Sequence, residues 1–155
     1  MTLPGDEGTG DSARPTTVVE QLSLPPRASS AREARRWVVR QLEVWSLEPL
    51  CEQVELLTTE VVTNSLLHAG TPMLVEVVRE GAGVRVSVTD GSSVVPTRRR
   101  YSPNASTGRG MTLLSGLADD YGWHTTPGGK VTWFRVERVR DAWGDVRFDD
   151  VMGGP

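Results

Sequence analysis

The sequence predicts an α/β fold, a two-layer sandwich in which helices cover one face of a mixed, mainly antiparallel sheet. Segments rich in β-branched residues occur in pairs around short turns, which is typical of antiparallel hairpins. Two segments with apolar residues at three- and four-residue intervals stand together ahead of these pairs and indicate helices. Because strands and helices are grouped and do not strictly alternate, their order favours a single sheet with helices on one face.

The length and charge of the chain predict one ordinary domain with tails. The chain has 155 residues and a formal net charge of −3 at pH 7, and this length is sufficient to bury a core. We expect residues 1–15, which have few large apolar side chains, to form a disordered leader. Residues 16–138 form the predicted domain, and residues 139–155 form a flexible acidic tail.

Composition also limits the partner and the compartment. The mildly acidic balance argues against direct nucleic-acid binding, and the basic run at residues 98–100 lies among turn signals typical of a solvated loop. Lys130 is the only lysine among 17 cationic residues, which we attribute to coding bias. Cys51 stands alone, so no internal disulfide can form, and a cytoplasmic location without membrane insertion is expected.

The first half of the chain predicts a strand followed by two helices. Residues 17–24 suit a strand closed by two prolines. Ser29 or Ser30 can cap the first helix. Its apolar face carries Ala31, Ala34, Val38, Leu42 and Trp45. The second helix begins near residues 47–49 and is terminated by Gly70. Its apolar stripe carries Val54, Leu57, Val61 and Ser65.

The second half predicts two hairpins separated by a long loop and a helix. Residues 73–78 and 84–90 form the first hairpin, and the two-residue period places Asp90 on the same face as the valines of its second strand. A carboxylate is therefore expected where a core side chain belongs. After that hairpin the sequence predicts a loop over residues 91–107, a helix over 110–118 and strands at 121–126 and 131–137.

Two polar residues on the second helix are candidates for phosphate chemistry. Glu60 and Asn64 are four residues apart, about one helical turn, so both project from one stripe of an otherwise apolar segment. The Asn64 amide can give an oxygen to Mg²⁺, and Glu60 can take a proton from an attacking hydroxyl or water.

The remaining candidates would hold a base and phosphates. Asp90 can accept a hydrogen bond from an exocyclic amine such as that of adenine. Gly108 and Gly110 let the backbone approach phosphate where a helix begins, and Arg109 either adds charge there or is an exposed helix-start residue. His68 is interpreted as a helix-end or packed residue. The segment PGGKVT lacks the spacing of a phosphate loop and is interpreted as a hairpin turn.

Three stretches, taken in order, resemble the motifs of one superfamily. The N box of the GHKL (histidine kinase-like) ATPases is similar to ELLTTEVVTNSLLHAG, the G1 box to VSVTDGSS and the G2 box to TGRGMTLLSGLADDYGW. Within the superfamily, the anti-sigma-factor serine/threonine kinases most resemble the chain in TEVVTNSLLHAG and GWHTTPGGKVTWFRVE. The resemblance covers residues 18–136.

This resemblance implies a Bergerat-type ATP-binding fold with ATP and Mg²⁺ as cofactors. In such a site Asn64 would be the metal ligand, Glu60 the catalytic base and Asp90 the adenine anchor. Further nucleotide contacts would come from Ser92, Gly108, Arg109, Gly110 and Met111. A lid over residues 92–107 would close over the phosphates.

The resemblance also implies protein partners. Family members phosphorylate a serine of a STAS-fold anti-anti-sigma protein, bind a sigma factor in competition and form homodimers. The G1 box of the family is DxGxG, whereas Ser92 and Val94 occupy its glycine positions here. Two functions therefore stay open: an ATP-dependent protein serine/threonine kinase, and a non-enzymatic, degenerate nucleotide-binding or partner-binding switch.

Overall fold

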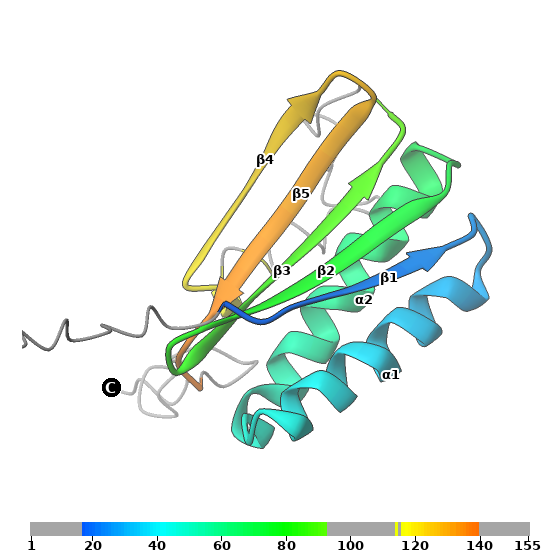
Figure 1. The fold of residues 1–155 in the computed structure, drawn as a ribbon. Helices are drawn as coiled ribbons and strands as arrows, with labels where there is room; N and C mark the ends of the chain where they lie inside the picture. Colours follow the sequence, from blue (N-terminus) through cyan, green and yellow to red (C-terminus); the bar gives the residue numbers. More distant parts are fainter. Residues whose placement is uncertain (1–16, 93–113, 115, 140–155) are drawn as a thin grey trace, which may run out of the picture.

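The structure is a computed structural model that describes residues 17–92, 114 and 116–139. Within these residues, two α-helices pack on one face of a five-stranded sheet (Figure 1). The elements in chain order are β1 (Val19–Leu24), α1 (Ser29–Val44), the 3₁₀ turn η1 (Glu48–Leu50), α2 (Cys51–His68), β2 (Met73–Glu80), β3 (Gly83–Asp90), β4 (Asp120–Thr126) and β5 (Gly129–Val136). The expected two-layer α/β sandwich is confirmed.

The strand order across the sheet is β1-β2-β3-β5-β4, and each neighbouring pair runs antiparallel. Both predicted hairpins are present, β2 with β3 and β4 with β5. The β2–β3 turn is short, and Gly81 adopts a φ of 59° there, a conformation that residues with a side chain rarely adopt. No parallel pair occurs among the described strands. The sequence predicts a mixed, mainly antiparallel sheet, and the described part of the sheet is entirely antiparallel.

The inner face of the sheet follows the two-residue period of its strands. In β3 the valines at positions 84, 86 and 88 are buried, and Asp90 is buried on the same face, as predicted. Strand pairing sets Val86 opposite Val77 of β2 on one side and Phe134 of β5 on the other. These apolar side chains form the layer on which the helices pack.

Helix α2 buries the stripe predicted for it. Its residues Val54, Leu57, Val61 and Ser65 are at most 2% exposed. The preceding η1 turn takes up Pro49, which is tolerated in a first helical turn. The helix ends where expected, because Gly70 has a φ of 61° and its amide donates to the Ser65 carbonyl at 3.3 Å.

Helix α1 also buries its expected face, but the proposed serine cap is wrong. Ala34, Val38 and Leu42 are fully buried. Ala28 occupies the N-cap position, and no side chain caps the helix. The Ser30 hydroxyl instead donates to the Pro25 carbonyl at 2.6 Å. The serine therefore stabilises the link between β1 and α1.

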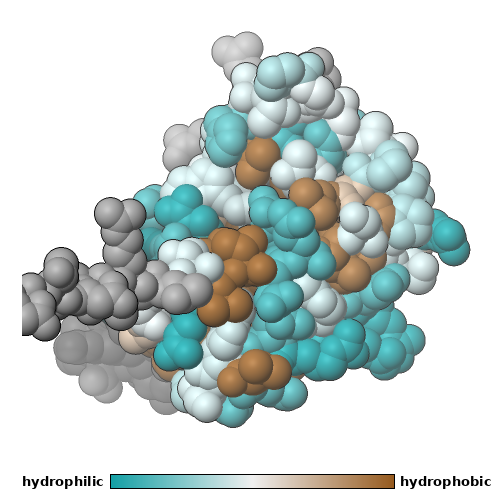
Figure 2. All heavy atoms as spheres, viewed as in Figure 1, coloured by the Kyte–Doolittle hydropathy of each residue, from teal (hydrophilic) through white to brown (hydrophobic). Residues whose placement is uncertain are grey.

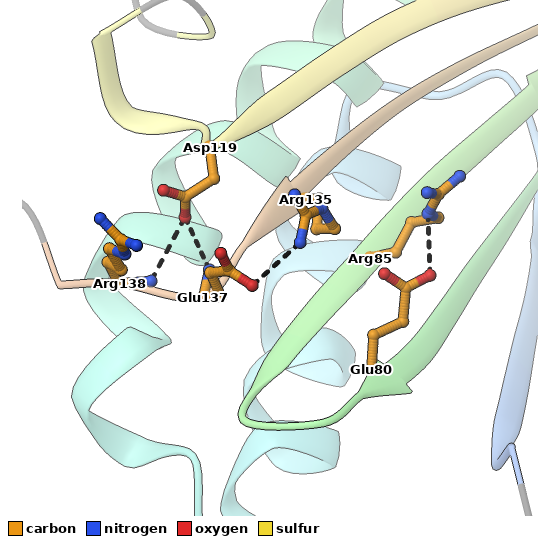
Figure 3. Close-up of polar contacts among 6 residues, drawn as sticks. All are labelled: Glu80, Arg85, Asp119, Arg135, Glu137 and Arg138. Atoms are coloured by element: carbon orange, nitrogen blue, oxygen red, sulfur yellow. Dashed lines mark hydrogen bonds and ion pairs between the residues drawn. The ribbon is translucent and has the colours of Figure 1, made fainter.

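The outer face of the sheet carries paired charges (Figure 3), and none of the helices in the described residues lies over it. Arg85 pairs with Glu80 at 3.0 Å, and its guanidinium lies 4.5 Å from the ring centroid of Trp133 on β5. Arg135 pairs with Glu137 at 2.9 Å. Hydrophilic and hydrophobic side chains are interspersed on the face drawn in Figure 2. Charged and aromatic groups thus cover the solvent side of β3 and β5.

The end of the predicted 110–118 helix lies against α2. The Ala118 amide donates to the Leu114 carbonyl at 3.0 Å, and Leu114 and Leu117 are buried. The Gln53 side-chain amide of α2 donates to the Leu117 carbonyl. The rest of that helix, the leader, the tail beyond residue 139 and the expected lid beyond Ser92 lie outside the described residues.

Gly129, the first residue of β5, permits the close approach of β5 to the end of β3. A Cβ atom at this position would lie 1.8 Å from the Asp90 carbonyl oxygen. The adjacent Gly128 has no atom within 4 Å of an added Cβ. The packing therefore requires glycine at position 129 but not at position 128.

We predict that Gly129→Ala destabilises the protein by about 1 to 3 kcal/mol, since the methyl group forces the backbones of β3 and β5 apart. Gly128→Ala, one residue earlier in the same turn, is the matched control and should be close to neutral. Urea unfolding of both variants followed by circular dichroism measures the difference. Equal stability of the two variants would show that the strands are not held this closely.

Candidate functional site

The candidate site is built from α2 and the carboxyl end of β3. The two elements are joined locally, because the Gly91 amide after β3 donates to the Thr71 hydroxyl after α2 at 2.8 Å. In Figure 1 the arrowhead of β3 and the end of α2 lie at the same end of the molecule. This contact joins the segment after α2 to the end of β3 that carries Asp90.

Glu60 and Asn64 lie on α2 beside its buried stripe. Both are half-buried, and each is followed by a buried residue, Val61 and Ser65 respectively. Since the helix is continuous from Cys51 to His68, their four-residue spacing places them on one side of it, as predicted. The site thus has a carboxylate and an amide one turn apart, at the border between core and solvent.

The donors on α2 fit a magnesium ion that is held mainly by a nucleotide. The described residues contain no group of three His, Cys, Asp or Glu side chains that could hold a metal ion. Mg²⁺ at nucleotide sites commonly keeps several waters and takes only one or two protein oxygens in addition to phosphate oxygens. The amide oxygen of Asn64 can supply such a ligand.

Asp90 is buried, and both of its carboxylate oxygens accept hydrogen bonds. Its Oδ2 atom accepts from the Lys130 ammonium at 2.7 Å, and its Oδ1 atom accepts from the Ser92 amide at 2.9 Å. The Lys130 and Asp90 side chains are only 4% and 0% exposed. The ion pair compensates the cost of burying two charges, and the Ser92 amide further stabilises the charged carboxylate.

Lys130 is the functional candidate that sequence reasoning missed. The sequence predicts a hairpin turn around this residue, whereas Lys130 lies in β5 directly opposite Asp90. A signal for it existed, because the period of two places Lys130 on the same strand face as the buried residues Phe134 and Val136. A buried lysine on a core face requires a partner, but only the strand register identifies Asp90 as that partner.

Two further residues considered from the sequence, Cys51 and His68, lie at the two ends of α2. His68 is exposed in the last turn of α2, as expected for a helix-end residue. Burial raises the pKa of the Cys51 thiol, and the carboxylates of Glu43, Glu48 and Glu55 add to the shift, so this cysteine is a weak nucleophile at neutral pH. Gly108, Arg109, Gly110 and Met111 lie outside the described residues.

A family model described as a histidine kinase-like ATPase domain matches residues 24–136. The chain belongs to the histidine kinase-like ATPase family. Comparison with curated proteins gives no match. Among the described residues, no helix has the length and apolar character that a membrane span requires. Membership of the histidine kinase-like family supports a nucleotide site of the ATP-binding kind, and the matched range includes Glu60, Asn64 and Asp90.

We predict strong coupling between Asp90 and Lys130 in a double-mutant cycle. Lys130→Met or Asp90→Asn alone should cost about 3 to 5 kcal/mol, because each leaves a buried charge without its partner. The double variant should recover a large part of that loss. Urea unfolding of the four proteins gives the coupling energy.

The exposed ion pair between Arg35 and Glu55 is the control for this cycle. Its atoms are 3.2 Å apart, and its side chains are 36% and 43% exposed. Exposed pairs of this kind contribute about 0 to 1 kcal/mol. A coupling energy between Asp90 and Lys130 as small as that of the control pair would contradict a buried ion pair.

Proposed function

We propose that this protein is an ATP-dependent protein serine/threonine kinase that also acts as an anti-sigma factor. In this proposal it works in the cytoplasm as a homodimer, phosphorylates a STAS-fold anti-anti-sigma protein and sequesters a sigma factor. Two observations carry the proposal: Glu60 and Asn64 lie one turn apart on α2, and Asp90 is buried at the end of β3, all within a histidine kinase-like domain. The partners are inferred from the sequence resemblance alone.

Glu60 and Asn64 have different roles in phosphoryl transfer. The acceptor hydroxyl oxygen attacks the γ-phosphorus of ATP, and the bond from that phosphorus to the bridging oxygen of ADP breaks. Glu60 takes the hydroxyl proton as the new P–O bond forms. Asn64 gives its amide oxygen to Mg²⁺, which when bound neutralises charge on the phosphates.

Asp90 supplies selectivity for the base. Its carboxylate accepts a hydrogen bond from the exocyclic amine of adenine, whereas guanine presents a carbonyl oxygen at the equivalent position. A buried acceptor that faces another acceptor loses its hydrogen bond and adds repulsion, at a cost of about 1 to 3 kcal/mol. The proposal therefore includes a preference for ATP over GTP.

A non-enzymatic switch is the second candidate function. Ser92 and Val94 stand where the G1 box of the family has glycines, and a side chain there can hinder backbone approach to the nucleotide. Such a protein would still bind its partners, and it would bind nucleotide weakly or without phosphoryl transfer. The two functions differ in one measurable property, which is phosphate transfer to a protein.

We predict that variants of α2 separate chemistry from binding. Glu60→Gln should retain ATP affinity, and its rate of phosphate transfer should fall by about 10²- to 10⁴-fold, because a general base acts on the chemical step. Asn64→Ala should lose the Mg²⁺-dependent part of ATP affinity. Glu52→Gln, the same chemical change at an exposed position of α2, is the control. Calorimetric titration with ATP, with and without Mg²⁺, measures affinity.

We predict that one STAS-fold protein of the same cell is phosphorylated on a serine or threonine when mixed with this protein, labelled ATP and Mg²⁺. The new phosphate adds nearly two negative charges to the partner, so the complex should dissociate by repulsion and desolvation. Glu60→Gln should bind the partner without labelling it. ATP binding without label on any candidate would favour the switch, and activity surviving in Glu60→Gln would exclude Glu60 as the base.

A further inference from the structure

Among the described residues, the Lys130 ammonium has more N–H donors than acceptors around it. A lysine ammonium has three N–H donors. Within the described part of the chain, one acceptor is recorded for Lys130, the Asp90 Oδ2 atom at 2.7 Å. The side chain is only 4% exposed, so water does not satisfy the other donors as it would at the surface. The buried group is therefore equipped to donate to a further acceptor.

The position of this ammonium is fixed by the sheet. Lys130 is paired with Asp90 across the β3–β5 ladder, and Gly129 permits the close approach of the two backbones at that point. Lys130 is also the only lysine in the chain, while the other 16 cationic residues of the 17 are arginines. A lysine ammonium is a compact donor, in contrast to the planar fork of an arginine.

The pair is suited to a neutral ligand edge. Its two charges compensate each other, so a phosphate attracted by Lys130 would be repelled by Asp90. What the pair offers is a strong donor next to a strong acceptor, with 2.7 Å between the two atoms. The complementary edge carries an acceptor next to a donor. Adenine has this arrangement on its Watson–Crick edge, where the ring nitrogen N1 accepts and the N6 amine donates.

We propose that Lys130 is a second base-reading residue that donates to N1 of adenine while Asp90 accepts from the N6 amine. This inference rests on the proposed ATP site. In the same pose guanine would place its O6 atom against the carboxylate and its N1–H group against the ammonium, so both contacts would fail. Because the pair is buried, a nucleotide can reach it only when the surrounding structure opens. The two side chains have little contact with water, so few hydrogen bonds to water are lost when the base binds.

The test changes one atom of the nucleotide and leaves the protein intact. In 1-deaza-ATP a C–H group replaces N1, so the acceptor for Lys130 is lost while the N6 amine stays. The unmodified protein should bind 1-deaza-ATP about tenfold or more weakly than ATP, since a buried charged donor is left without its partner. The control is 7-deaza-ATP, which alters the ring away from N1 and should bind like ATP. Calorimetry measures all three affinities.

The variant Lys130→Met, or Lys130→Met combined with Asp90→Asn if the single variant does not fold, should bind ATP and 1-deaza-ATP equally. Loss of this preference is a readout that a merely structural lysine would not affect. Equal binding of ATP and 1-deaza-ATP to the unmodified protein would overturn the inference and leave the ATP site standing. No binding of any of the three nucleotides would overturn the ATP site and this inference together.

Discussion

The strict alternation of β3 is the constraint on which the site depends. Three valines on one face of this central strand are buried under the helices, and the same period carries Asp90 into the core. A one-residue shift in the register of β3 would move the Asp90 carboxylate to the solvent face but would also expose the valines. The apolar packing therefore keeps the carboxylate buried. The sheet compensates with Lys130 on the neighbouring strand. The hydrophobic core thus stabilises a polar centre that would be costly alone.

The parts predicted well from sequence are those that local periodicity determines. The buried stripe of α2, its termination at Gly70 and the inward position of Asp90 each follow from spacing within one element. The role of Lys130 could not be predicted in this way, because its partner is 40 residues away and only strand register joins them. The Ser30 cap failed for a different, local reason, since its hydroxyl donates to the Pro25 carbonyl five residues earlier and not to the helix.

The two halves of the site rest on different kinds of support. Glu60 and Asn64 are carried by a helix whose neighbouring stripe is buried in the core, so their relative position is as rigid as the helix itself. Asp90 is placed at a strand end, where the Ser92 and Lys130 contacts fix its carboxylate. In the proposed site, base recognition and phosphate chemistry therefore depend on separate packing, so a variant can lose one and keep the other. A kinase and a switch built on this fold would differ in few residues.

The burial of Lys130 has a practical consequence for chemistry on this protein. Lys130 is the one lysine of this sequence and is only 4% exposed, so reagents that acylate lysine find no exposed lysine ammonium on the folded residues. Lys130 becomes acylated only while the structure around it is open, so its rate of modification reports the local opening free energy, as amide hydrogen exchange does. The protein carries its own single-site chemical probe of the region in which we place the nucleotide base.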